Sequence, residues 1–456
     1  MNNNKNNSNN VNQLINEEIM EMSATQVSEE KQPSNALPMV IVAGLFFILG
    51  FATWLNGSLM PYLKQILQLT PFEASLILFS FYIAVTFTAL PSASIIRKVG
   101  YKSGMALGMA TMMVAGLLFI PAAKTQIFAL FLFAQLVMGT GITLLQTAVN
   151  PYVVRIGPEE SAAARISIMG ILNKGAGVVA PMVFTALILS GFQEVGGELS
   201  QVQIDDMANS LVLPYLGMAI FLGLLAIAVK KSPLPELASE EDFCEGSKGE
   251  GHQSHLKEAL SHPNLALGVL ALFFYVAAEV IAGDTIGTFA LSLGVGNYTM
   301  MTSYTMLCMV AGYILGIALI PRIISQQKAL MVSAIVGLLL TVGIVFGDNN
   351  SFAIANAILG GVQLPDTLVL IAFLGFANAI VWPAVFPLAL SGMGKLTSIG
   401  SALLIMGISG GAFGPLFWSL SSTTSMGEQG GYLVLLPCYL FILFYAVKGH
   451  KMKSWS

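Results

Sequence analysis

The chain has 456 residues, of which 55% are hydrophobic and only 10% are charged, and its mean hydropathy is +0.77. This balance excludes an ordinary soluble domain, in which about a quarter of the residues are charged, and it indicates an integral membrane protein. The net charge of −4 and the scattered basic residues give no support for nucleic acid as a partner.

Cysteine and histidine, the commonest soft metal ligands, are few and dispersed. The three cysteines show no pairing pattern, so we expect three free thiols. All four histidines fall in polar stretches, which leaves no imidazole to relay protons inside the membrane, and their spacing indicates no metal site. We expect neither a metal nor another cofactor. These residues are Cys244, Cys308, Cys438, His252, His255, His262 and His450.

Residues 1–37 are rich in Asn, Ser and Glu, and they lack the basic start and apolar core of a cleaved secretory signal. We expect a disordered cytoplasmic tail. From Pro38 onward, apolar runs long enough to cross a bilayer recur with short polar breaks. Twelve such runs predict an all-α membrane protein. Their expected limits are 38–63, 72–95, 103–122, 125–152, 162–190, 211–230, 264–291, 298–320, 328–347, 365–390, 396–420 and 429–448.

The distribution of cationic residues predicts how these spans are oriented, because Lys and Arg collect on the cytoplasmic side of a membrane. With the N-terminus inside, seventeen of the twenty Lys and Arg residues fall on the inner side. Only Lys64 and Lys124 fall outside, and Lys174 lies within the fifth span. An odd number of spans would scramble this bias, so we expect both termini in the cytoplasm of a multi-pass plasma-membrane protein.

A long acidic stretch, residues 231–263, divides the spans six and six and is interpreted as a cytoplasmic linker. It separates an expected N-terminal six-helix bundle at 38–230 from a C-terminal one at 264–448, with a cytoplasmic tail at 449–456. The fifth and eleventh spans share glycine and proline breakers, around Pro181 and Pro415. Spans six apart that share breakers are typical of a parallel duplication.

The seventh span carries two acids, Glu279 and Asp284, with Gly283 beside the second. An ionisable residue inside a membrane is a functional candidate by default. Five residues at roughly 100° each place the two carboxyls about 140° apart on a straight helix. Either the helix breaks near Gly283 and both acids reach one cavity, or Glu279 faces the cavity and Asp284 turns toward a neighbouring helix.

The turn between the second and third spans, Ile96 to Gly104, is short, basic and rich in glycine. It resembles the loop signature of the major facilitator superfamily, although the acid usual in that signature is missing. The stretch from Pro321 to Lys328 is a weaker copy at the matching place in the second half. Alone, this loop could equally be a basic cytoplasmic turn; the twelve spans and the central linker favour a transporter.

Further motifs resemble the fucose-galactose-glucose symporter family of that superfamily, and the similarity runs from Phe46 to the end of the chain. It implies two bundles, alternating access and uptake of a monosaccharide with a coupling cation. The stretch Glu279 to Asp284 looks most like the carriers of glucose, galactose and, above all, N-acetylglucosamine. The motifs are Phe51 to Gly57, Gln146 to Tyr152, Gly157 to Ser161, Tyr275 to Glu279 and Pro383 to Leu388.

The sequence departs from the fucose carriers of that family at two places. Those carriers have an acid directly after the Asn of the first-span motif and another at the start of the fourth-span motif; here these positions are Gly57 and Gln146. Neither residue can exchange protons. We therefore expect Glu279 and Asp284 to carry the coupling to H⁺ or Na⁺.

A sugar site needs amides and carboxylates for the hydroxyls and an aromatic plate for the weakly apolar ring face. Polar and aromatic residues of this kind occur in the first, fourth, fifth, seventh and tenth spans. Amides in membranes also tie helices together, and tryptophans also mark interfacial belts, so both alternatives stay open. The candidate substrate-binding residues are Trp54, Asn56, Gln146, Asn150, Asn173, Glu279, Asn378 and Trp382.

Lys174 is the only basic residue deep in a span, and an ion pair with Glu279 or Asp284 is the simplest way to hold it there. Such a pair could be a static clamp between the halves or a switch that breaks in each transport cycle.

No phosphate-binding loop and no convergent nucleophile, base or metal ligands are apparent, so we expect no catalytic residues and no enzyme. The leading hypothesis is a monomeric secondary transporter that takes up glucose, galactose or N-acetylglucosamine across the bacterial inner membrane. The alternative is a transporter-like sugar sensor that moves no substrate.

Overall fold

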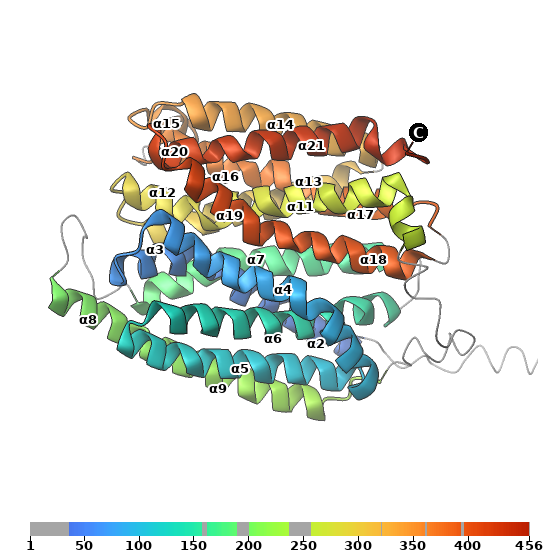
Figure 1. Ribbon diagram of the computed structural model, residues 1–456, viewed down its shortest axis with the longest axis horizontal. Coiled ribbons are helices and arrows are strands. Elements are labelled where there is room, and N and C mark those ends of the chain that lie inside the picture. The colour runs from blue at the N-terminus through green and yellow to red at the C-terminus, as the bar shows by residue number, and fades with distance from the viewer. Residues whose placement is uncertain are drawn as a thin grey trace, which may run out of the picture.

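The structure is a computed structural model, and it describes residues 36–156, 162–188, 200–236, 257–320, 322–360, 363–393 and 396–455. Within these ranges all regular secondary structure is helical (Figure 1). The expected N-terminal tail, apart from residues 36 and 37, lies outside the described residues, as do residues 237–256 of the linker and the motif at 157–161.

Among the residues that the structure describes, twelve helices or broken helices are long and apolar enough to cross a membrane, which confirms the predicted number. In the N-terminal half, spans one to six are α2 and α3, α4, α5, α6, α7, and α8 with α9. Their bounds are α2 Ala36–Trp54, α3 Asn56–Ile66, α4 Pro71–Val99, α5 Tyr101–Thr125, α6 Phe128–Arg155, α7 Ala162–Ile188, α8 Gln201–Ser210 and α9 Val212–Lys231.

The C-terminal half repeats this order with more interruptions. Spans seven to twelve are α11 and α12, η4 with α13, α14, α16 with α17, α18 to α19, and α20 to η8. Their bounds are α11 Pro263–Asp284, α12 Ile286–Ser292, η4 Tyr298–Met300, α13 Met301–Leu319, α14 Gln326–Phe346, α15 Ala353–Leu359 (a loop helix), α16 Asp366–Ala379, α17 Val381–Leu390, α18 Thr397–Met406, η6 Gly407–Ser409, α19 Gly410–Ser421, α20 Gly427–Gly431, η7 Tyr432–Val434, α21 Leu435–Val447 and η8 Gly449–Lys451.

Most span limits differ from the predicted ones by a few residues, but the sixth span begins at Gln201 and not at 211. The reason is a capping box, in which the Ser200 and Gln203 side chains bond each other's backbone N–H groups. The short α8 that follows buries Ile204 and Met207. A count of apolar residues does not detect α8 because the helix is polar. The capping box fixes its first residue, and its buried face packs it against the rest of the bundle.

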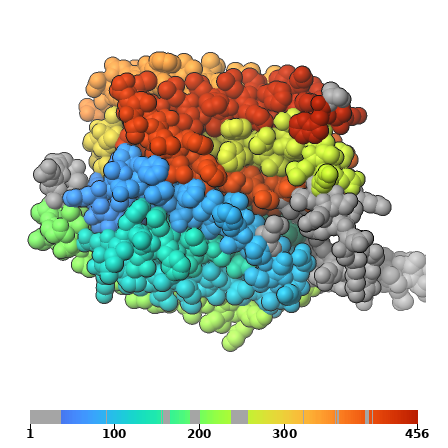
Figure 2. Space-filling model, viewed as in Figure 1, coloured from blue at the N-terminus to red at the C-terminus, as the bar shows by residue number. Residues whose placement is uncertain are grey.

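The two halves form two helical bundles that lie one above the other in Figure 1, with α3 to α9 below and most of α11 to α21 above. The space-filling view shows them meeting along most of the length of the molecule (Figure 2). Two helix pairs make the main contact between the bundles: α7 with α13, and α4 with α19. The first pair joins spans five and eight, and the second joins spans eleven and two. Spans five and eleven occupy equivalent places in the two halves, and so do spans eight and two. This arrangement is what a duplicated six-helix unit predicts.

Spans one and seven are interrupted at matching places. The first breaks at Leu55, between α2 and α3, and the seventh at Thr285, between α11 and α12. Two residues after each break stands a glycine, Gly57 or Gly287. A Cβ on Gly287 would lie 3.1 Å from the carbonyl oxygen of Gly57, so the two helices touch through backbone at this crossing. Small residues permit such close approach in membranes.

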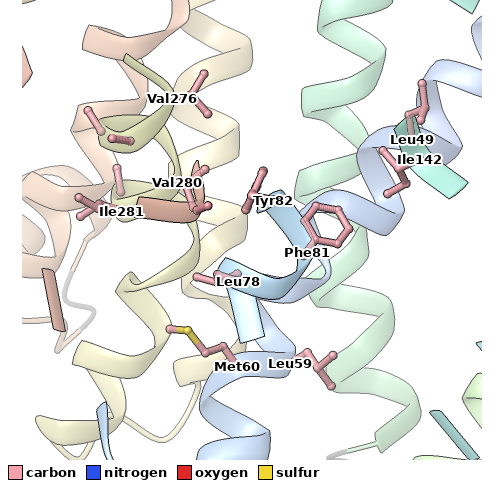
Figure 3. Packing of buried hydrophobic residues seen from close by; sticks show 14 of the residues in the cluster. Leu49, Leu59, Met60, Leu78, Phe81, Tyr82, Ile142, Val276, Val280 and Ile281 are labelled. Carbon is pink, nitrogen blue, oxygen red and sulfur yellow. The ribbon is translucent and has the colours of Figure 1, made fainter. Parts of the chain in front are cut away.

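The buried apolar core is continuous across both bundles. Figure 3 shows part of it, with Phe81 and Tyr82 of α4 between the first span and α11. Tyr82 lies beside Val280 in this view. The helices that carry the polar candidates are therefore held in place by apolar packing on their other faces.

Candidate substrate and coupling site

An ion pair joins the two bundles near the middle of the membrane spans. The Lys174 Nζ of α7 lies 2.6 Å from the Glu279 Oε1 of α11. Both residues are less than a tenth exposed. The Tyr275 hydroxyl, one helical turn earlier on α11, donates to the same Glu279 oxygen at 2.8 Å. Desolvated charges need this kind of partner, so the structure pairs Lys174 with Glu279 and not with Asp284.

Trp54, the last residue of α2 in the N-terminal bundle, lies beside this pair. Its ring centroid is 4.3 Å from Lys174 Nζ, within the range of a cation–π contact. Its indole N–H donates to Asn173 Oδ1 at 3.4 Å, and the Asn173 amide donates to the backbone oxygen of Phe46 at 3.4 Å. Trp54 is 2% exposed. It is therefore buried between bundles, which argues against an interfacial aromatic belt.

Trp382 lies on the C-terminal side, in α17. Its ring packs against Tyr275, with centroids 6.4 Å apart, and stacks on Phe386 at 5.7 Å. Unlike Trp54, Trp382 is half-buried. Aromatic and charged groups thus run continuously from Trp54 through Lys174, Glu279 and Tyr275 to Trp382. We call these five residues the central cluster.

Three amides predicted from the sequence are half-buried and not fully enclosed: Gln146 and Asn150 on α6, and Asn173 on α7. The first two make no side-chain hydrogen bond to another residue within the described ranges, and the Asn173 bonds are long. Amide groups that are half-enclosed and weakly engaged can exchange water for sugar hydroxyls.

The two remaining amide candidates are tied within their own bundles. Asn56 on α3 is 3% exposed and accepts a 2.8 Å hydrogen bond from Gln135 of α6. Asn378 on α16 is fully buried and accepts a 2.9 Å hydrogen bond from the Tyr439 hydroxyl of α21. Each side chain still has an amide N–H group without a partner among the described residues. Their geometry fits helix bracing at least as well as sugar binding.

Asp284 does not join the central cluster. It ends α11, about 7.5 Å along the helix axis from Glu279, and it faces Gly57 of α3. A Cβ on Gly57 would lie 2.9 Å from Asp284 Oδ1 and 3.0 Å from the Gly283 carbonyl oxygen. The carboxyl of Asp284 thus turns toward a neighbouring helix, which is one part of the second arrangement considered above. The span is interrupted one residue later, at Thr285.

Polar contacts join the bundles at the end of the molecule where α3, α8, α12 and α20 lie, on the left in Figure 1. Lys64 and Glu428 form an ion pair at 2.6 Å. Hydrogen bonds link Tyr298 to Gln65, Thr185 to Thr299, and Ser75 to Ser419, at 3.3, 2.8 and 3.1 Å. We call this group the α3-end contacts. They close this end of the interface above Asp284 and the crossing of Gly57 with Gly287.

Sequence reasoning missed two members of this arrangement as site residues, Tyr275 and Gln135. Tyr275 is one helical turn before Glu279, and that i, i+4 spacing is the signal that could have linked them. Gln135 offers a weaker signal, a single amide in an otherwise apolar part of α6. The partner of Gln135, Asn56, lies on a different helix, so spacing within one helix could not identify it.

Comparison with known proteins places this geometry in a family. The family model described as Major Facilitator Superfamily matches residues 42–415. The chain belongs to the major facilitator superfamily. Its members are transporters and not enzymes, which agrees with the prediction from sequence.

Curated relatives cover almost the whole chain. A glucose/galactose transporter of Brucella abortus is 32% identical over 94% of this chain and 97% of its own length. The L-fucose-proton symporter of Escherichia coli is 27% identical over 91% and 93%. Among solved structures, the crystal structure of the transporter FucP in the outward conformation has a TM-score of 0.68 at 25% identity, and covers 91% of this chain and 98% of its own. These relatives confirm the family indicated by the motifs.

Proposed function

We propose that this protein is a secondary active transporter that takes up a monosaccharide together with a proton by alternating access. The observation that carries the proposal is the central cluster, in which a charged pair from both bundles lies between two tryptophans. The activities of the relatives, glucose/galactose transport and L-fucose-proton symport, support the class of substrate and the coupling ion.

The candidate residues suit a sugar because together they offer the required surfaces. Half-buried Trp382 offers an aromatic face for the apolar side of a pyranose, and Gln146, Asn150 and Asn173 offer amides for its hydroxyls. We propose glucose or galactose as the substrate, with N-acetylglucosamine as the further candidate that the stretch from Glu279 to Asp284 suggests.

We propose that the protein lies in the bacterial inner membrane with both termini in the cytoplasm, as a monomer. Support comes from the basic residues that end α4 and α9, Arg97, Lys98, Lys230 and Lys231, which all lie at the end opposite to the α3-end contacts. The α3-end contacts then face outward and form an outer seal. Residues 38–230 and 264–448 are the two rocking units, joined by the linker.

Uptake into proteoliposomes tests this function. Radiolabelled glucose, galactose and N-acetylglucosamine are offered separately under an inward proton gradient, an inward Na⁺ gradient, or none. We expect saturable accumulation of at least one hexose, driven by the proton gradient and abolished by a protonophore. Accumulation driven by the Na⁺ gradient alone would show that the coupling ion is Na⁺ and not the proton. If none of the three sugars showed saturable uptake, the proposal would be refuted.

The aromatic face has its own test within that assay. Replacing Trp382→Leu removes the ring and should raise the KM for the transported sugar about tenfold, because an aromatic contact of this kind contributes about 1 kcal/mol or more. Trp455→Leu is the matched control, since Trp455 lies exposed beyond the last span. Equal KM values for the two variants would show that Trp382 does not contribute to sugar binding.

A further inference from the structure

Asp284 is the buried acid that the central cluster does not use. It has no exposed surface, and neither carboxylate oxygen has a hydrogen-bond partner within the part of the chain that the structure describes. Glu279, by contrast, holds both Lys174 and Tyr275. Two acids five residues apart on one helix therefore stand in opposite electrostatic situations.

Among the described residues, the titratable groups around Asp284 include no cation that is free to pair with it. On its own helix the titratable neighbour is Glu279, on α7 it is Lys174, and on α4 it is Tyr82, which faces the carboxyl without meeting hydrogen-bond geometry. Lys174 is already bonded to Glu279. Tyr82 is wedged against Gly411 of α19, because a Cβ on that glycine would lie 2.8 Å from its ring.

The other neighbours of Asp284 are backbone atoms and a hydroxyl group that is already hydrogen-bonded elsewhere. Gly57 of α3 packs directly on the carboxyl, and Thr302 of α13 donates its hydroxyl hydrogen to the Gly283 carbonyl oxygen at 2.7 Å. An ionised carboxylate enclosed in this way has no cation of its own and no hydrogen bond among the described residues, which is among the costliest arrangements in a membrane interior. A protonated carboxyl is neutral and fits the same space, so the closed arrangement favours Asp284 with its proton bound.

We propose that Asp284 is the proton-binding group that controls the outer seal: α3 and α12 close over it only when it is protonated. The inference rests on the proposed function, in that the bound proton is the one transported. Asp284 takes one proton from water outside while the seal is open, and it returns one proton to water inside later in the cycle. Glu279 is bonded to Lys174 in the closed arrangement, so the two acids have different tasks.

The same geometry explains Gly57. Because its Cα hydrogen occupies the space beside Asp284 Oδ1, any side chain at position 57 would displace the carboxyl or separate α3 from α11. The glycine at position 57 in the first bundle thus leaves the space that the carboxyl of Asp284, in the second bundle, occupies.

The seal can be tested without any sugar. Gln65, half-buried at the α3-end contacts, is replaced by cysteine as a reporter, and intact cells are treated with a membrane-impermeant maleimide at external pH from about 5 to about 9. Rates are divided by those of an Asn350→Cys reporter, which is exposed at the same end and corrects for thiol ionisation. The protein without a reporter gives the background from its native cysteines.

We expect the corrected rate to rise at least about fivefold with pH, because ionised Asp284 holds the seal open. In Asp284→Asn, a neutral side chain of the same shape, the rate should stay low at every pH. The matched control is Asp348→Asn, whose carboxyl is exposed near the same end, and it should keep the full pH dependence.

Three outcomes would overturn the proposal: labelling independent of pH in the parent, a pH dependence that survives Asp284→Asn, or labelling that follows external Na⁺ and not pH. Because no transport is measured, these results are distinct from a failure of sugar uptake. A protein that labels as expected but accumulates no sugar would keep the proton-dependent seal and lose the proposed function.

Discussion

At the scale of single residues, the pair of Lys174 and Glu279 explains how one lysine is tolerated deep in the membrane. Its ammonium has a carboxylate at 2.6 Å and the Trp54 ring at 4.3 Å, and the carboxylate has a second donor in Tyr275. Such a network stabilises only while it is complete. Removing one charge strands the other, whereas removing both charges leaves neutral groups.

We therefore predict that Lys174→Met is much less stable than the double variant Lys174→Met with Glu279→Gln. The single change should lower the free energy of unfolding by about 3 to 5 kcal/mol, and the double change should recover most of it, because no unpaired charge remains. Melting temperatures of the purified proteins in detergent measure this. Sugar accumulation should be lost in both variants.

Lys64→Met provides the comparison: the Lys64 side chain is 18% exposed and the Lys174 side chain 11%, so the loss of Lys64 should lower the free energy of unfolding by less. If Lys174→Met melted at the same temperature as the double variant, the central ion pair would have no role in stability.

At the scale of helices, the matching breaks in spans one and seven shape the interface. Each break is followed by a glycine, and these glycines let α3 and α12 cross through their backbones. The same breaks separate the half-helices near the α3 end from those that carry Trp54 and Glu279. A seal and a binding site can thus be built from one pair of spans.

Gly57→Ala tests this crossing. The added methyl group would lie 2.9 Å from Asp284 Oδ1 and closer still to the Thr302 hydroxyl, so the helices must separate. Overpacking of this kind costs about 1 to 3 kcal/mol, and we expect a lower melting temperature together with at least about tenfold slower sugar uptake.

The matched control is Gly44→Ala in α2 of the same span, where a Cβ would meet no atom within 4 Å. It should leave uptake unchanged and keep or slightly raise the melting temperature, since alanine favours helix more than glycine does. Equal effects at the two positions would show that the crossing is not tightly packed.

At the scale of the whole molecule, the α3-end contacts hold the two bundles together at one end, while the central cluster joins them in the middle. Alternating access requires the contacts at each end to form and break in turn. The ion pair between Lys64 and Glu428 is suited to this because it joins spans one and twelve, and the Lys64 side chain is more exposed than that of Lys174.

Reversing one charge of that pair should open the seal. In Lys64→Glu the two carboxylates repel, and we expect sugar uptake to fall about threefold to tenfold, with faster maleimide labelling of the Gln65→Cys reporter. The exchange variant Lys64→Glu with Glu428→Lys should restore both values toward those of the parent. An exchange variant as impaired as the single one would indicate that the pair does not act through its charges.

Much of this protein could be predicted from the sequence alone. The number of spans, their approximate limits and the family follow from apolar length and from short motifs, which are properties of local segments. The sixth span shows the limit of this approach, because the polar helix α8 belongs to it through a cap and a buried face that a hydropathy count does not detect.

The candidate site divides in the same way. The sequence by itself determined that Glu279, Asp284 and Lys174 each need a partner or a proton, since their cost in a membrane follows from residue type and position. Only the tertiary structure decided which they have: Lys174 meets Glu279, and Asp284 meets Gly57, because spans one, five and seven are distant along the chain and are brought together only by the packing of the bundles. A single helix fixes the angle between two carboxyls, but its neighbours decide what each carboxyl faces.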